Sequence, residues 1–143
     1  MDIRQLTPRY SVSPQIAAED LPDIAAAGFT RVICNRPAAE VPPSHQAAAI
    51  RAATEAAGLT FDLLELTHQT MTPENVARQR ALIETPGGPV LAYCASGTRC
   101  SVIWALGQAG TMTSDDILAA TAAAGYRLDN LRPVLDQAAA AKG

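Results

Sequence analysis

The chain has 143 residues, a formal net charge of −3 and a sequence pI of about 5.2. It lacks the run of lysine and arginine that nucleic-acid binding needs, and its apolar stretches are shorter than the ~20 residues that span a bilayer. Hydrophobic residues make up 48% of the chain but aromatic residues only 4%, which favours alanine-rich helices packed closely on a sheet. The length predicts one domain over residues 1–143.

Short apolar runs rich in β-branched residues alternate with alanine-rich helical segments along the chain. In chain order they predict a strand at 10–13, a helix at 17–28, a strand at 29–35, a helix at 45–57, a strand at 60–66, a helix that begins after Thr72, a strand at 89–93, and helices at 99–108, 114–124 and 130–141. Ser44 and Ser114 are the expected N-caps of their helices. The alternation predicts an α/β fold with a mostly parallel sheet of about four strands flanked by helices.

Ligands of such sheets bind beyond the carboxyl ends of the strands. Three segments meet that description: NRPAAEVPP (35–43), THQTMT (67–72) and CASGTR (94–99). In the third, a strand leads directly into a cysteine, a glycine-containing loop, an arginine and a helix. The backbone N–H groups of such a turn can point inward and form an anion-binding nest. We therefore expect substrate contacts from Ala95, Ser96, Gly97 and Thr98.

Cys94 and Arg99 are the expected catalytic residues of this loop. A cysteine at the mouth of the nest experiences a positive potential that favours the thiolate, the form in which cysteine is a nucleophile. The planar guanidinium of Arg99 can hold an anion with two hydrogen bonds. The plainer alternative makes Cys94 a buried small hydrophobe and Arg99 a surface residue.

The stretch YCASGTRCS resembles the active-site loop shared by rhodanese-type sulfurtransferases and cysteine-based phosphatases. With SVSPQI, AAAGFTRVICNRP and TPENV, it makes residues 9–110 similar to the phosphatase-like domain family of the beta-lactamase-hydrolase-like proteins. The resemblance implies a fold like that of dual-specificity phosphatases and an activity described in that family as either phosphatase or sulfurtransferase. Ala95 stands where the family loop usually has arginine, and Cys100 where it usually has serine.

Two features distinguish sulfur from phosphate chemistry. Phosphatases of this type place five residues between cysteine and arginine, whereas this chain places four. Dual-specificity phosphatases also carry an aspartate general acid in the loop equivalent to 67–72, where this chain offers only His68. The sequence therefore favours a sulfurtransferase that forms a Cys94 persulfide from a small anionic sulfur donor and passes the sulfur to a thiol acceptor. Phosphate-ester hydrolysis is the alternative, and a non-catalytic anion-binding or redox-sensing module is a second.

Four further residues lie near the predicted site, and each has two interpretations. Arg36 either helps to hold the anion or forms a surface ion pair, and His68 either protonates a leaving group or is a solvated loop residue. Cys100 is either a resolving thiol that closes a disulfide with Cys94 or a packing residue. Ser101 either hydrogen-bonds the Cys94 sulfur or satisfies its own helix backbone.

The remaining expectations concern cofactors and location. The cysteines and histidines lack the spacing of a metal site, and the sequence indicates no cofactor. The N-terminal residues MDIRQLTPRY lack the apolar core of an export signal, which predicts a cytoplasmic protein without a membrane span. In that compartment three cysteines indicate thiol chemistry or burial rather than a disulfide framework.

Overall fold

The computed structural model describes residues 1–142, which form a single α/β domain around one five-stranded sheet. The strands are β1 (Arg4–Thr7), β2 (Tyr10–Ser13), β3 (Arg31–Cys34), β4 (Thr60–Leu63) and β5 (Val90–Tyr93). Their order across the sheet is β1-β2-β5-β3-β4. β1 pairs antiparallel with β2, and the other neighbouring strands pair in parallel. The predicted mostly parallel sheet is therefore confirmed, with one strand more than expected.

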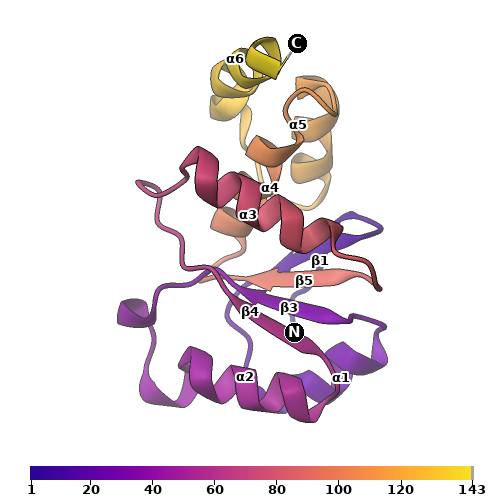
Figure 1. The fold of residues 1–143 in the computed structure, drawn as a ribbon, viewed down its shortest axis with the longest axis vertical. Helices are drawn as coiled ribbons and strands as arrows, with labels where there is room; N and C mark the ends of the chain where they lie inside the picture. The colour runs from indigo at the N-terminus through magenta and orange to yellow at the C-terminus, as the bar shows by residue number, and fades with distance from the viewer. Residues whose placement is uncertain (143) are drawn as a thin grey trace.

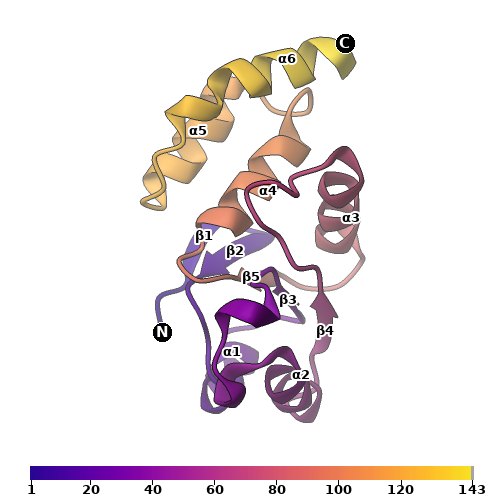
Figure 2. The same cartoon turned by 90° about the vertical axis from the view of Figure 1, so that its left-hand side faces the viewer.

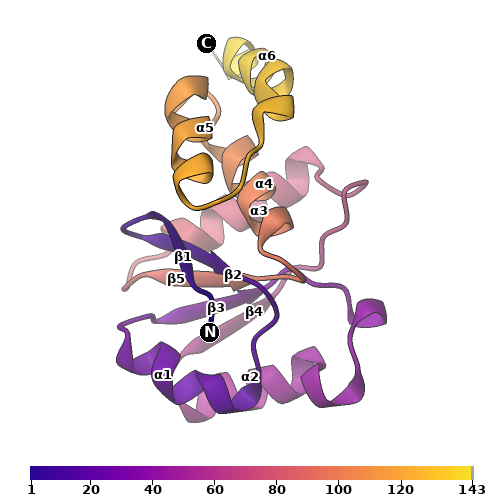
Figure 3. The same cartoon turned by 180° about the vertical axis from the view of Figure 1, so that it is seen from behind.

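Helices cover both faces of the sheet. Figure 1 shows α1 (Leu21–Ala26) and α2 (Ala47–Ala56) on one face, and α3 (Pro73–Glu84) and α4 (Thr98–Gln108) on the other. A further layer, α5 (Ser114–Ala123) and α6 (Arg132–Lys142), lies at the end of the molecule beyond α4 (Figures 2 and 3). Within residues 1–142, none of these helices has the length and apolar character needed to cross a membrane.

The central strand β5 fixes the position of the cysteine loop. Val90 and Ala92 face the core that includes α3 and α4, while Leu91 and Tyr93 face the core that includes α1 and α2. Burying a side chain such as Leu91 contributes about 1.5–3 kcal/mol, so the register of β5 is strongly specified. Since β3 and β4 run parallel to β5, the segments that follow all three strands reach the same edge of the sheet.

The residues of β1 carry almost no strand signal, so the sequence predicts no strand there. Only Leu6 of the four is buried. The strand forms because a tight turn folds it back onto β2, and the Thr7 hydroxyl accepts hydrogen bonds from the backbone N–H groups of Arg9 and Tyr10. Pairing with β2 therefore decides the conformation of a segment whose own propensity does not.

Both serine caps were predicted wrongly. Ser44 lies inside a short 3-10 turn, Pro43–His45, and α2 begins two residues later behind Gln46. Ser114 is the first residue of α5, and Thr113 is the cap, with its hydroxyl accepting from the Asp116 N–H at 3.0 Å. Each error is a shift along the chain of one or a few residues, the distance over which sequence patterns locate helix ends poorly.

The Thr113 cap gives a direct test of this assignment. Thr113→Ala should lower the free energy of unfolding by about 1 kcal/mol, because one N–H at the start of α5 loses its acceptor. Ser114→Ala, the matched control next to it, should change stability by less than about 0.5 kcal/mol. Chemical denaturation of the two variants would contradict the assignment if Ser114→Ala proved the more damaging.

Candidate active site

Cys94 directly follows β5, and the loop behind it folds back over its sulfur. The Gly97 N–H donates to the Cys94 Sγ at 3.1 Å, and the backbone N–H groups of Ser96 and Cys100 also hydrogen-bond this sulfur. The residue is fully buried, so it lies at the floor of the nest and not at its mouth, where the sequence had placed it. The expected inward turn of the N–H groups is present, and it is this turn that covers the sulfur.

These donors favour a charged sulfur. The Cys100 thiol, which hydrogen-bonds Cys94, makes the largest contribution to lowering the pKa, and the backbone N–H groups of Cys100, Ser96 and Gly97 add to it. Burial acts in the opposite direction, because it disfavours the charged form. The result is a Cys94 pKa of about 5, which makes the sulfur a thiolate at neutral pH.

Gly97 allows the turn for two reasons. Its φ of 91° lies in the left-handed region that favours glycine. A Cβ at this position would also come within 2.2 Å of the Tyr126 hydroxyl. That hydroxyl donates to the Ser96 carbonyl at 2.9 Å, so Tyr126 holds the outer side of the loop. Its position leaves no room for a side chain at residue 97.

Cys100 and Ser101 have different roles in the first turn of α4. Cys100 is fully buried, and burial raises its pKa well above the ordinary value, with the neighbouring Cys94 adding to the effect. It is therefore a neutral thiol that can donate to the Cys94 sulfur, and both cysteines are free of disulfides. Its role as a resolving thiol stays a prediction. The Ser101 hydroxyl donates to the Gly97 carbonyl at 2.8 Å, the backbone-satisfying alternative.

A buried polar network supports the loop from behind. Asn35 donates to the Leu64 carbonyl at 2.8 Å, and its side-chain amide forms a reciprocal pair with that of Gln79 at 2.9 and 3.0 Å. Gln79 also donates to the Tyr10 hydroxyl, which donates to the Cys100 carbonyl at 2.9 Å. This chain connects the end of β3 and the middle of α3 to the start of α4, and each polar group in it has a partner.

Arg99 points its guanidinium group at the carboxylate of Glu40. Nη1 donates to one carboxylate oxygen at 2.9 Å and Nη2 to the other at 2.7 Å, while Nη1 also donates to the Leu66 carbonyl at 2.9 Å. The pair lowers the pKa of Glu40 and raises that of Arg99. Parallel two-point contact is the geometry with which arginine holds carboxylates and phosphates alike. Glu40 therefore occupies the face of Arg99 that an anionic substrate needs.

Arg36 contacts this glutamate rather than the nest. Its Nη2 donates to the Glu40 carbonyl at 3.0 Å, its Nε lies 3.5 Å from a carboxylate oxygen of the same residue, and Nη1 donates to the Gln15 side chain. Arg36 therefore forms the ion pair that was the alternative to anion binding. It holds Glu40, the residue whose carboxylate competes with an anion for Arg99.

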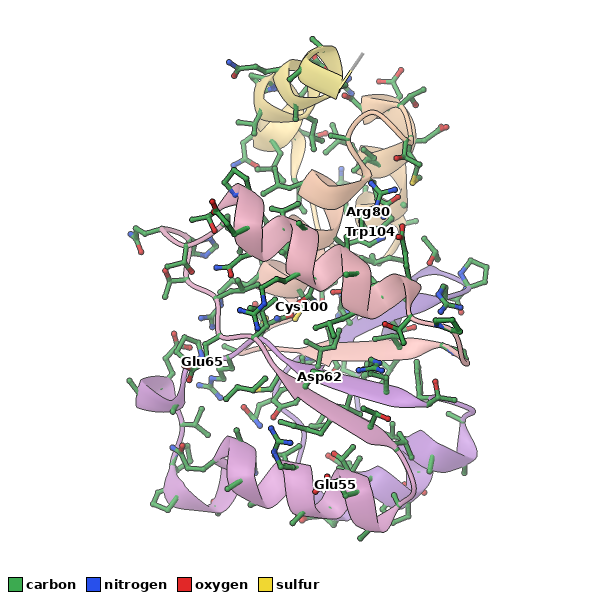
Figure 4. All side chains as sticks on the ribbon, in the orientation of Figure 1. Glu55, Asp62, Glu65, Arg80, Cys100 and Trp104 are labelled. Atoms are coloured by element: carbon green, nitrogen blue, oxygen red, sulfur yellow. The ribbon has the colours of Figure 1, made fainter. Side chains whose placement is uncertain are left out.

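The three loops predicted to share one edge do meet there. A pocket of about 450 Å³ is lined by Glu40, Thr67, His68, Gln69, Ser96, Thr98 and Arg99. His68 thus faces the same space as Arg99, whereas Ala95 is exposed and does not line it. Cys100 and Glu65 mark this edge of the sheet in Figure 4. Within residues 1–142, no group of three or more histidine, cysteine, aspartate or glutamate side chains is arranged to hold a metal ion.

Three contributors to the site were missed from the sequence. Glu40 lay in a predicted loop but carried no signal of its own. Tyr126 is 27 residues beyond Arg99, and Gln79 is a polar residue within a helix, so neither has a local pattern that connects it to the loop. Only their contacts in the folded chain reveal them.

A comparison with known protein families identifies the family of this chain. Residues 2–111 match the family model described as "Beta-lactamase hydrolase-like protein, phosphatase-like domain". The chain belongs to this family. The predicted resemblance, and the fold that it implied, are therefore confirmed.

Individual relatives extend this result. A beta-lactamase hydrolase-like protein of Xylella fastidiosa (strain Temecula1) is 29% identical over 130 residues, which cover 90% of this chain and 30% of that protein. The chain thus spans less than a third of the length of the curated relatives it matches. A protein of Neisseria meningitidis, described as a "putative phosphatase", is 37% identical with a TM-score of 0.86, covering 96% of this chain and 99% of that one.

A second solved structure supports the fold alone. A Shewanella putrefaciens protein of the same description is 20% identical with a TM-score of 0.71, covering 99% of this chain and 93% of that one.

The family and the Neisseria relative favour the phosphatase alternative over the sulfurtransferase that loop length and the missing aspartate had suggested. Loop length was a weak criterion, because it was compared with other cysteine phosphatases and not with this family.

The Cys94 pKa can be measured without access to the sulfur. Ultraviolet absorbance of the thiolate should titrate with a midpoint near 5, and Cys94→Ser should remove that transition. Cys100→Ala should raise the midpoint toward the ~8.5 of a free thiol, whereas Cys100→Ser, which keeps a donor, should leave it low. A midpoint near 8.5 in the unaltered protein would contradict a buried thiolate.

The Arg99–Glu40 pair predicts competition with anions. Above the lowered pKa of Glu40 its carboxylate is charged, so Glu40→Gln should tighten the binding of inorganic phosphate about fivefold, the factor for an ion pair worth about 1 kcal/mol. Glu84→Gln, which removes the carboxylate of a surface pair with Arg80, is the matched control. Titration calorimetry would count against competition if Glu40→Gln weakened phosphate binding.

Proposed function

We propose that this protein is a cysteine-dependent phosphatase that hydrolyses phosphate monoesters. The single observation that carries the proposal is the Cys94 sulfur, which accepts backbone N–H groups at the carboxyl end of β5 with Arg99 at the adjoining pocket. Membership of a phosphatase-like family supports phosphate as the substrate anion.

Each residue of the proposed site has a chemical role. The Cys94 thiolate attacks phosphorus, and the phosphoryl group moves from the ester oxygen to the sulfur. Arg99, beside Ser96 and Thr98 in the pocket, stabilises the negative charge on the phosphoryl oxygens, while the Gly97 N–H stabilises the charge on the sulfur. Water then attacks the phosphocysteine and releases inorganic phosphate and the thiolate, so no cofactor is consumed.

His68 is the proposed proton donor to the leaving oxygen. It lines the same pocket as Arg99, and the loop from residue 67 to 72 has no carboxylate that could take that role. Alkyl alcohols are poor leaving groups and need this proton, whereas a nitrophenol leaves readily without it. The identity of the leaving group therefore separates a catalytic histidine from a surface one.

Substrate binding requires Arg99 to release Glu40, and attack requires the loop to uncover the buried Cys94 sulfur. The two-point pair is closed in this structure, and a phosphate dianion offers the same geometry with more charge. Arg36 keeps hold of Glu40 through its backbone carbonyl, so the glutamate side chain can turn away while its loop stays in place.

The assay uses para-nitrophenyl phosphate and an alkyl phosphate, with thiosulfate plus cyanide in parallel. Cys94→Ser should abolish ester hydrolysis, and Arg99→Lys should reduce kcat about a hundredfold in a folded protein, because lysine lacks the planar fork. His68→Gln should reduce alkyl phosphate hydrolysis about a hundredfold and spare the nitrophenyl ester, while His45→Gln changes neither.

Three results would overturn the proposal. Cys94-dependent sulfur transfer from thiosulfate without ester hydrolysis would make the protein a sulfurtransferase. Phosphate binding without turnover of either substrate would make it an anion-binding module. Ester hydrolysis that persists in Cys94→Ser would place the chemistry elsewhere.

A further inference from the structure

An apolar groove begins at the anion pocket and follows α4. His68 and Thr98 line the anion pocket and also the first part of the groove, a pocket of about 330 Å³. Met71, Leu106 and Val134 line this pocket and the next one, of about 400 Å³, between α3 and α6. The shared side chains place the three spaces next to one another, so the alkyl chain of a molecule held at the loop is beside the groove.

The chemistry of the lining changes abruptly at Thr98. On the loop side the pocket is polar and charged, with Arg99 and Glu40. Beyond it the walls are mainly aliphatic, from Val102, Leu106, Leu128, Leu131 and Val134, with Asn130 as the polar exception. At the far end the Arg80 guanidinium bonds Glu84 and the Gly107 carbonyl.

Part of this aliphatic wall is open to water. Val134 on α6 is 48% exposed and belongs to a small set of large hydrophobic side chains that are exposed among the described residues. Open apolar surface beside a polar pocket is typical of sites that bind a ligand with one charged and one apolar end. From Thr98 to Leu106 the groove follows eight residues of helix, about 12 Å, which is long enough for an extended alkyl chain.

We infer that the substrate is an amphipathic phosphate monoester, with its phosphate at the Cys94–Arg99 loop and its alkyl chain in the groove along α4. The inference rests on the proposed function, because that function supplies the phosphate end. A second polypeptide could also cover Val134, but it would not require a groove that adjoins the anion pocket. The groove and the anion pocket share His68 and Thr98, and this adjacency is what selects a substrate chain as the occupant.

The first test compares butyl, octyl and dodecyl phosphate, each below the concentration at which it forms micelles. Each fully buried methylene tightens binding about fourfold. The kcat/KM should therefore rise at least tenfold from butyl to octyl phosphate, even where the groove covers only part of the alkyl chain. Val134→Glu should bring the octyl-to-butyl ratio close to one. Leu63→Glu adds the same charge at an exposed leucine on β4 outside the groove, and it should keep the full ratio.

A binding measurement separates this inference from the proposed function. Butyl and octyl phosphonates, which lack the scissile ester bond, are titrated into Cys94→Ser protein. Tighter binding of octyl phosphonate that is lost in Cys94→Ser/Val134→Glu supports the groove whether or not the enzyme turns over. Hydrolysis of butyl and octyl phosphate with equal kcat/KM, and equal affinity for the two phosphonates, would overturn the groove and leave the phosphatase standing.

Discussion

Burial of a negatively charged sulfur at the end of the central strand is the constraint on which the site depends. An uncompensated charge in that position would be very costly, so the chain has to bring donors to it. It does so with backbone N–H groups from the loop and the first turn of α4, and with the thiol of Cys100. The donors can converge only because Gly97 adopts a positive φ beneath Tyr126. The buried thiolate and the shape of its loop are thus two consequences of one requirement.

The polar network behind the loop explains why that shape persists. Asn35, which follows β3, Gln79 on α3 and Tyr10 on β2 are linked by hydrogen bonds that end on the Cys100 carbonyl. A fully satisfied network in a low-dielectric interior is rigid, because breaking any link leaves a buried polar group without a partner. The start of α4 is therefore held from inside by this network and from outside by Tyr126. The Arg99–Glu40 pair lies at the solvent side, in the pocket that the three loops line.

The buried network orients the sulfur, and the Arg99–Glu40 pair lies at the entrance, where we propose that an anionic substrate replaces the carboxylate. The groove along α4 adds apolar contacts at a distance from the reacting atoms. Such contacts help catalysis when they hold the substrate in the reactive position, so a long-chain ester could gain both affinity and orientation from a surface that touches no reacting atom.

The sequence alone determined the parts of this protein that depend on local order. Strand, cysteine, glycine-containing loop, arginine and helix follow one another within 20 residues, so their chemistry was visible, as were the alternating elements of a parallel sheet. Tertiary structure decided what depends on contacts between distant segments: the pairing of β1, the burial of Cys94, and the roles of Glu40, Gln79 and Tyr126. Hydrogen bonds and ion pairs between such residues leave no periodic trace in the chain, because nothing about their own neighbours requires them. The cysteine-to-arginine loop was therefore predictable from residues 94–99, whereas the Arg99–Glu40 pair and the groove beside it depend on the packing of α3, α4, α6 and the loops.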